Sequence, residues 1–254
     1  MLPSGVRAAA TVATGGVLME LAYGTARAVL LPVLHLGLQW TVEGADRISL
    51  DGPVILASNH TSYLDPLALA YVADRRKRRV RFLAKAELFE KPALGAFLRA
   101  AQQIPVSRGS ASASGALDDA VAALHRGACV AVFPEGTISL DLEPMRGKSG
   151  TARLARASGV PVTPVGLWGA HRLMFKGRRP HWERGVAEVA VVGDPVAVAP
   201  DDDIRAATDR IMSGICAQVA RARARYPAVP SGADDWWVRT PETAVLRPAK
   251  RTAS

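Results

Sequence analysis

A histidine and an aspartate five positions apart are the residues in this sequence best suited to proton transfer. His60 and Asp65 lie in the segment NHTSYLD, which directly follows an apolar run. A histidine can act as a general base near neutral pH, and a carboxylate can hold its ring in the required tautomer. On one helix the two side chains would point about 140° apart, from 3.6 residues per turn. They can therefore meet only if the residues between them form a loop.

The dipeptide Asp65-Pro66 supports such a loop, because Asp suits the residue before a helix and Pro suits the first turn. The same pattern has a structural interpretation, in which Asp65 only caps the helix and His60 is a hydrogen-bonded turn residue. The spacing alone leaves both interpretations open.

A second polar segment, FPEGTIS at 133–139, also follows an apolar run. Pro134 ends the predicted strand, and Gly136 lets a ligand approach the backbone closely. Glu135 and Thr137 add polar groups there. Ligand sites in open α/β sheets gather at the carboxyl ends of the strands, so we expect both segments at one edge of a sheet. A simple turn that ends a strand is the alternative.

Apolar runs alternate with amphipathic segments after residue 42. Strands without internal alternation, each followed by a helix, indicate an α/β fold with a mostly parallel central sheet flanked by helices. The expected strands lie near residues 54–58, 80–84, 103–106, 128–133, 160–168 and 187–192, and the expected helices at 66–73, 93–100, 111–125, 148–157 and 204–225.

The two ends of the chain differ from this central part. Between residues 8 and 40 the only charged side chains are Glu20 and Arg27, yet no uncharged stretch reaches the 18–20 residues of a membrane span. We expect two short helices, at 8–22 and 25–38, that lie in a membrane interface or pack on the core. The predicted organisation is an N-terminal membrane-docking segment (1–40), one catalytic domain (41–226) and a flexible tail (227–254).

The composition limits the classes of binding partner that we expect for this protein. Of 254 residues, 49% are hydrophobic and 22% charged, which excludes a wholly disordered chain. The net charge of +9 favours an anionic partner, and basic residues cluster at 75–79 and 172–184. These clusters are either a solvated surface or a docking surface for an anionic membrane or an acidic protein. Aromatic residues make up only 6%, so we expect no nucleic-acid partner.

Neither a metal site nor a disulfide framework is expected. Cys129 and Cys216 form no CxxC pair, which favours a reducing compartment. His171 and His181 lie in a basic loop without the spacing of metal ligands.

Four segments, taken in order, resemble the glycerolipid acyltransferase family, which includes the lysophosphatidic acid acyltransferases. NHTSYLD matches the family's N-H-x4-D block, and FPEGTIS resembles its F-P-E-G-T-R-S block. QQIPVSRG (102–109) resembles the block that ends in a phosphate-binding arginine, here Arg108. GVPVTPVGLWG (159–169) resembles the fourth block. One block would be weak evidence, whereas four in order are strong.

The resemblance implies an acyltransferase that needs no cofactor beyond its thioester co-substrate, acyl-CoA or acyl carrier protein. It would acylate the 2-hydroxyl of 1-acylglycerol 3-phosphate to give phosphatidic acid, at the cytoplasmic face of the cell membrane, as a peripheral or monotopic protein. His60, oriented by Asp65, would take the hydroxyl proton, and no acyl-enzyme is expected, so Ser62 need not be a nucleophile. The residues implied in substrate binding are Arg108, Glu135, Gly136, Thr137 and Lys148.

Two positions depart from the family pattern. Ile138 stands where the family usually has arginine, and Ser107 stands where an acidic residue is common. Arginine makes charged, bidentate phosphate contacts that isoleucine cannot make. A different lipid acceptor is therefore one alternative, and a non-catalytic peripheral lipid-binding protein is another.

Overall fold

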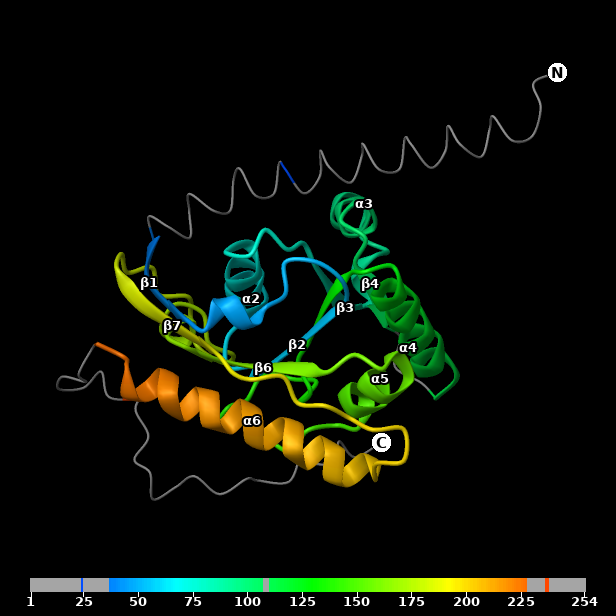
Figure 1. Ribbon diagram of the computed structural model, residues 1–254. Coiled ribbons are helices and arrows are strands. Elements are labelled where there is room, and N and C mark those ends of the chain that lie inside the picture. Colours follow the sequence, from blue (N-terminus) through cyan, green and yellow to red (C-terminus); the bar gives the residue numbers. More distant parts are fainter. Residues whose placement is uncertain (1–23, 25–36, 107–109, 228–235, 238–254) are drawn as a thin grey trace.

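A seven-stranded sheet forms the centre of the computed structural model, which describes residues 24, 37–106, 110–227 and 236–237 (Figure 1). The strands follow the spatial order β1-β7-β6-β2-β5-β3-β4. Their bounds are β1 (Leu38–Glu43), β2 (Val54–Ser58), β3 (Val80–Lys85), β4 (Ile104–Val106), β5 (Cys129–Val132), β6 (Val162–Trp168) and β7 (Val186–Val192). The predicted mostly parallel sheet is thus confirmed.

One antiparallel pairing reverses part of this sheet. Among the strands described, β6 and β7 pair antiparallel, while every other neighbouring pair is parallel. Strands β1 and β7 therefore begin at the edge where the other five end. We call this edge, which carries the loop after β2, the catalytic edge. The sequence patterns did not predict β1, and the helix expected to reach residue 38 is wrong at its end, because Leu38 already belongs to this outermost strand.

Helices cover both faces of the sheet. They are α2 (Asp65–Asp74), α3 (Pro92–Ala100), α4 (Ser110–His125), α5 (Gly150–Ser158) and α6 (Ile204–Ala224), with short 3-10 turns at η1 (Ala45–Arg47), η2 (Ala86–Leu88) and η3 (Ala170–Arg172). Apolar residues of α2 pack on one face, and those of α4, α5 and α6 pack on the other (Figure 1). Within the part of the chain that the structure describes, no helix has the length and hydropathy needed to cross a membrane.

The basic run at 75–79 lies at the edge opposite the catalytic edge. Arg78 in this run is only 7% exposed, and its guanidinium donates hydrogen bonds to the carbonyl oxygens of Ser49, Gly52 and Gly127. Charged hydrogen bonds to loop carbonyls stabilise the turns that precede β2 and β5. The interpretation of the whole run as a surface cluster is therefore wrong for Arg78, whose role is structural.

The predicted N-terminal helices and most of the predicted tail lie outside the described residues. Two tail residues that are described pack against the domain: Trp237 is 3% exposed and its ring meets that of Tyr226 at 5.4 Å, while Trp236 lies 5.3 Å from Phe175. These aromatic contacts tie residues 236–237 to the residues just after α6 and to the loop before β7.

Helix α6 approaches β6 so closely that one glycine is required. A Cβ added at Gly166 would lie 2.2 Å from the backbone carbonyl carbon of Gln218. Gly166→Ala should therefore lower the free energy of unfolding by about 1–3 kcal/mol, because overpacking forces the backbone to shift. Chemical denaturation measures this change. Gly115→Ala is the matched control, since nothing lies within 4 Å of its added Cβ; equal midpoints for the two variants would contradict the close approach.

Candidate active site

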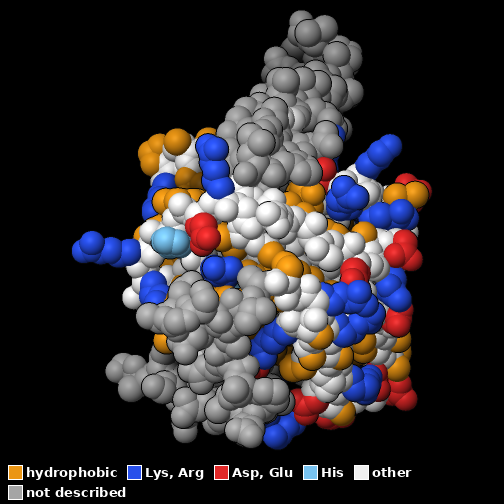
Figure 2. All heavy atoms as spheres, turned by 90° about the vertical axis from the view of Figure 1, so that its left-hand side faces the viewer, with side chains coloured by type: hydrophobic (Ala, Val, Ile, Leu, Met, Phe, Trp, Pro, Cys, Tyr) orange, Lys and Arg blue, Asp and Glu red, His pale blue; other side chains and the backbone are white. Residues whose placement is uncertain are grey.

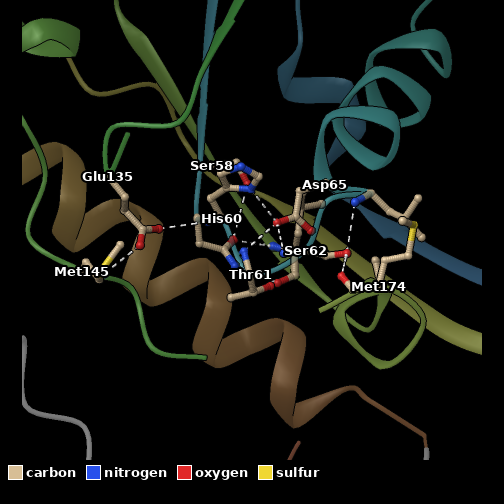
Figure 3. Close-up of polar contacts among 12 residues, drawn as sticks. Ser58, His60, Thr61, Ser62, Asp65, Glu135, Met145 and Met174 are labelled. Atoms are coloured by element: carbon tan, nitrogen blue, oxygen red, sulfur yellow. Dashed lines mark hydrogen bonds and ion pairs between the residues drawn. The ribbon is translucent and has the colours of Figure 1, made fainter. Parts of the chain in front are cut away.

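The His60 ring and the Asp65 carboxylate meet at the carboxyl end of β2 (Figure 3), with Nδ1 3.0 Å from Oδ2. Residues 59–64 form a loop and α2 begins at Asp65, which is the arrangement that the spacing required. The same Asp65 oxygen accepts the N–H groups of Thr61 at 2.6 Å and Ser62 at 2.7 Å. The carboxylate therefore turns back onto the loop instead of capping its own helix.

This contact determines which ring nitrogen faces a substrate. The Asp65 side chain is 1% exposed, whereas that of His60 is 17% exposed. A carboxylate at Nδ1 favours the tautomer whose proton is on Nδ1, because the proton can then be donated to Oδ2. In this tautomer Nε2 carries a lone pair and can accept a proton from a hydroxyl group.

The FPEGTIS segment forms hydrogen bonds with both backbone polar groups of His60, the N–H and the carbonyl. The His60 N–H donates to Glu135 Oε1 at 2.9 Å (Figure 3), and the Ser139 N–H donates to the His60 carbonyl at 2.7 Å. The ring of Phe133 stacks on the imidazole at 4.2 Å with 21° between the planes. Because β2 and β5 are parallel neighbours, the loops that follow them meet. We call the two hydrogen bonds that join Glu135 and Ser139 to the His60 backbone the clamp.

Glu135 is a buried residue that supports the histidine loop through hydrogen bonds to the backbone. It is 2% exposed, and its second oxygen accepts the Met145 N–H at 3.0 Å. Burial raises the pKa of Glu135 to about 8; the Met145 and His60 N–H donors act in the opposite direction, and the nearby Asp65 charge adds to the rise. Both oxygens are thus used on the backbone, a role that the sequence did not reveal.

The remaining predicted binding residues differ in position. Gly136 and Thr137 are exposed, and the Lys148 ammonium lies against Gly136, since a Cβ added there would be 2.6 Å from Nζ. Ile138 is 7% exposed and packs inward. Arg108 lies outside the described residues.

Ser62 has a structural role. Its hydroxyl donates to the Met174 carbonyl at 2.7 Å (Figure 3) and accepts the Leu64 N–H at 3.0 Å. Ser62 is fully buried. These contacts agree with the expectation that it need not be a nucleophile.

Sequence reasoning missed an arginine that supports the site from α6. Arg223 pairs with both oxygens of Glu143, at 2.8 and 3.0 Å, and donates to the Leu142 carbonyl at 2.7 Å. Its guanidinium also lies over the Trp168 ring, 4.1 Å from the centroid. It thereby holds the segment that leads to Met145. Nothing in the local pattern indicated this role, because the partners are 80 positions away in the sequence.

Asn59 anchors the start of the histidine loop and was missed as well. Its side chain donates to the Leu167 carbonyl at 3.0 Å and accepts the Leu167 N–H at 2.8 Å. The amide thereby extends the pairing between β2 and β6 by one step. The only signal was its position directly before His60.

The raised pKa of Glu135 predicts a pH dependence of stability. The folded state binds this proton more tightly than the unfolded state, whose pKa is near 4.5. The resulting stabilisation is fully present below pH 4.5 and is lost as the pH rises toward 8, with a slope of at most about 1.4 kcal/mol per pH unit. Glu135→Gln should flatten this slope in denaturation curves recorded across that window. The exposed Glu90→Gln is the control, and an unchanged slope in Glu135→Gln would contradict the assignment.

Comparison with known proteins adds the family. Residues 39–168 match the Acyltransferase family. The chain is 31% identical over 138 residues to the chloroplastic 1-acyl-sn-glycerol-3-phosphate acyltransferase BAT2 of Brassica napus, which covers 54% of this chain and 39% of that protein. It is 27% identical over 138 residues to the 1-acyl-sn-glycerol-3-phosphate acyltransferase of Bacillus subtilis, which covers 54% of this chain and 68% of that one. The chain spans about two fifths of the length of the first curated relatives it matches.

A solved structure supports the same grouping. The 1-acyl-sn-glycerophosphate acyltransferase PlsC from Thermotoga maritima superposes with a TM-score of 0.63 at 27% sequence identity, over 85% of this chain and 90% of that one. The family match contains the histidine loop and the FPEGTIS segment, and it extends over half of the sequence. This chain therefore belongs to the Acyltransferase family.

Proposed function

We propose that this protein transfers a fatty acyl group from a thioester donor, acyl-CoA or acyl carrier protein, to the 2-hydroxyl of 1-acylglycerol 3-phosphate. The observation that carries the proposal is the His60–Asp65 contact, held at the catalytic edge by the Glu135 and Ser139 hydrogen bonds to the His60 backbone. The names of the Brassica napus and Bacillus subtilis relatives support this acceptor.

The chemistry needs one base and no covalent enzyme intermediate. The acceptor hydroxyl gives its proton to Nε2 of His60 while its oxygen attacks the thioester carbonyl carbon. The carbon–sulfur bond then breaks, and the imidazolium returns the proton to the departing thiolate, so that an ester and a free thiol result. Asp65 stabilises the imidazolium. General-base catalysis of this kind contributes about 10²–10⁴-fold, and holding both substrates in place adds more.

Cationic, hydroxyl and backbone groups in and after the FPEGTIS segment are placed to bind the acceptor phosphate. Lys148 offers an ammonium over the open backbone of Gly136, and Thr137 offers a hydroxyl on the exposed rim. Arg108 is proposed as a further phosphate ligand. Glu135 supports these groups through the backbone.

We propose that the catalytic edge faces a membrane, at its cytoplasmic side, without spanning it. Large hydrophobic side chains are exposed on three loops at this edge: Tyr63 (54%), Leu140 (58%) and Trp182 (72%). Strand β1, which follows the apolar N-terminal segment in the sequence, begins at the same edge, and basic residues of the 172–184 cluster lie beside it. Each cation near an anionic bilayer is worth about 1 kcal/mol, and apolar side chains add insertion area.

A different lipid acceptor is the second candidate. Lyso-ornithine lipid O-acyltransferase of Rhizobium meliloti is 33% identical over 135 residues, covering 53% of this chain and 44% of that protein. The inward-packed Ile138 removes one cation that would favour a phosphate. A non-catalytic lipid-binding protein is the third candidate, which an intact His60–Asp65 contact disfavours.

Replacing His60 tests the mechanism directly. His60→Ala should lower acceptor-dependent thiol release from long-chain acyl-CoA by about 10²–10⁴-fold, because the general base is lost. Release is measured with purified protein in detergent, with and without lysophosphatidic acid. His125→Ala, an exposed histidine on α4, should match the wild type. An active preparation in which His60→Ala also matched the wild type would refute the mechanism, whereas release that requires another lipid hydroxyl would favour the second candidate.

Replacing Arg108 tests the phosphate contact. Arg108→Ala should weaken acceptor binding by about 1.5–3 kcal/mol, the range for a hydrogen bond to a charged group, and should raise the acceptor KM accordingly. Arg205→Ala, an exposed arginine on α6, serves as the control. An unchanged acceptor KM would remove Arg108 from the site.

A further inference from the structure

A cavity of about 440 Å³ lies between η3, the loop that follows it and the side chain of Trp236. Its walls include His171, Arg172, Phe175, Arg178 and Arg179. Figure 2 faces the β1–β7 side of the molecule and shows Lys and Arg side chains spread over this face. The volume falls in the usual range for small-molecule sites.

The charges that line the cavity favour an anion. Among the described residues that line the cavity, three arginines are accompanied by one carboxylate, that of Glu183, which lies 3.6 Å from Arg172. The Arg178 guanidinium stacks 3.9 Å above the Trp236 ring. Stacking on an aromatic face leaves the N–H donors at the edge of the guanidinium plane directed outward, so the fork is held ready for an oxyanion.

His171 is a second and independent sign of a ligand. It is 1% exposed, and within the described residues neither of its ring nitrogens has a hydrogen-bond partner. Burial, with Arg223 and Arg172 nearby, lowers the pKa of His171 to about 3, so the ring is neutral and offers one N–H donor and one acceptor. A buried polar side chain without a partner is rare in folded proteins, and a group bound in the cavity would supply one.

The cavity is joined to the active site by backbone contacts. Met174, in the segment that lines it, accepts hydrogen bonds at its carbonyl from the Ser62 hydroxyl at 2.7 Å and the Tyr63 N–H at 3.3 Å. Both donors belong to the histidine loop. A ligand held here would therefore lie at the catalytic edge.

We propose that this cavity binds a phosphate monoester, with Arg178 and Arg179 as its main ligands and His171 at its base. Among the described residues that line the cavity, arginines exceed carboxylates by two. A phosphate monoester carries close to two negative charges near pH 7, whereas a carboxylate carries only one. The proposal rests on the proposed function only in its source of phosphate, which is either the 3′-phosphate of CoA or the acceptor headgroup, the latter in place of the Lys148 and Arg108 contacts proposed above.

Calorimetric titration with sn-glycerol 3-phosphate tests binding without turnover, with glycerol as the neutral probe. The double variant Arg178→Gln/Arg179→Gln should weaken glycerol 3-phosphate binding by about a hundredfold, since each of the two charged hydrogen bonds is worth about a factor of ten. Arg184→Gln, an exposed arginine on the same loop outside the cavity wall, should bind like the wild type. The single variant Arg179→Gln, at an exposed position, guards against misfolding of the pair.

Two results would overturn the proposal: glycerol 3-phosphate that binds the wild type no better than glycerol, or an Arg178/Arg179 variant that binds like Arg184→Gln. Turnover then separates the two sources. If the Arg178→Gln/Arg179→Gln variant has a raised KM for lysophosphatidic acid alone, the cavity binds the acceptor. If this variant has a raised KM for acyl-CoA but an unchanged KM for acyl-dephospho-CoA, the cavity binds the donor. If the wild type binds glycerol 3-phosphate better than glycerol but shows no turnover, the proposed function is refuted and the cavity site is not.

Discussion

The hydrogen bonds that clamp the His60 backbone are the interaction on which the rest of the site depends. Glu135 accepts the N–H and Ser139 donates to the carbonyl, so His60 is held by the loop after β5 while its ring is oriented by Asp65 on α2. The central place of β2, between β6 and β5, makes this possible. One neighbouring strand supplies Leu167 to anchor Asn59, and the other supplies the clamp.

The clamp has its own support from the opposite face of the sheet. The carboxyl group of Glu135 also holds Met145, and the segment before Met145 is tied to α6 through Arg223. The backbone of helix α6 in turn packs directly against the backbone of β6, because Gly166 has no side chain. Removal of one partner of such a hydrogen bond is costly, because the other partner is left without compensation. A helix far from the histidine in sequence thus contributes to where the histidine lies.

The antiparallel β6–β7 pairing separates the two edges of the sheet in function. It brings the start of β1 and the loop before β7 to the edge that carries His60. Exposed hydrophobic side chains and the arginines of the cavity gather there, while Arg78 at the opposite edge stabilises turns. The function proposed above would use this arrangement, since it places the substrate, the phosphate ligands and the membrane contacts on one side.

The sequence by itself determined the mostly parallel sheet, the loop that lets His60 meet Asp65, and the nearness of that loop to FPEGTIS. These follow from apolar runs, from the angle between residues on a helix and from the common edge of parallel strands, all of which are local or topological rules. The tertiary structure alone decided the edge strand β1, the reversal of β7, the inward use of Glu135 and the cavity around His171. Each of these depends on partners distant in the chain: the half-buried β1 carries too weak a pattern to be seen, and a carboxylate, a guanidinium or an imidazole shows its role only when its buried neighbours are known.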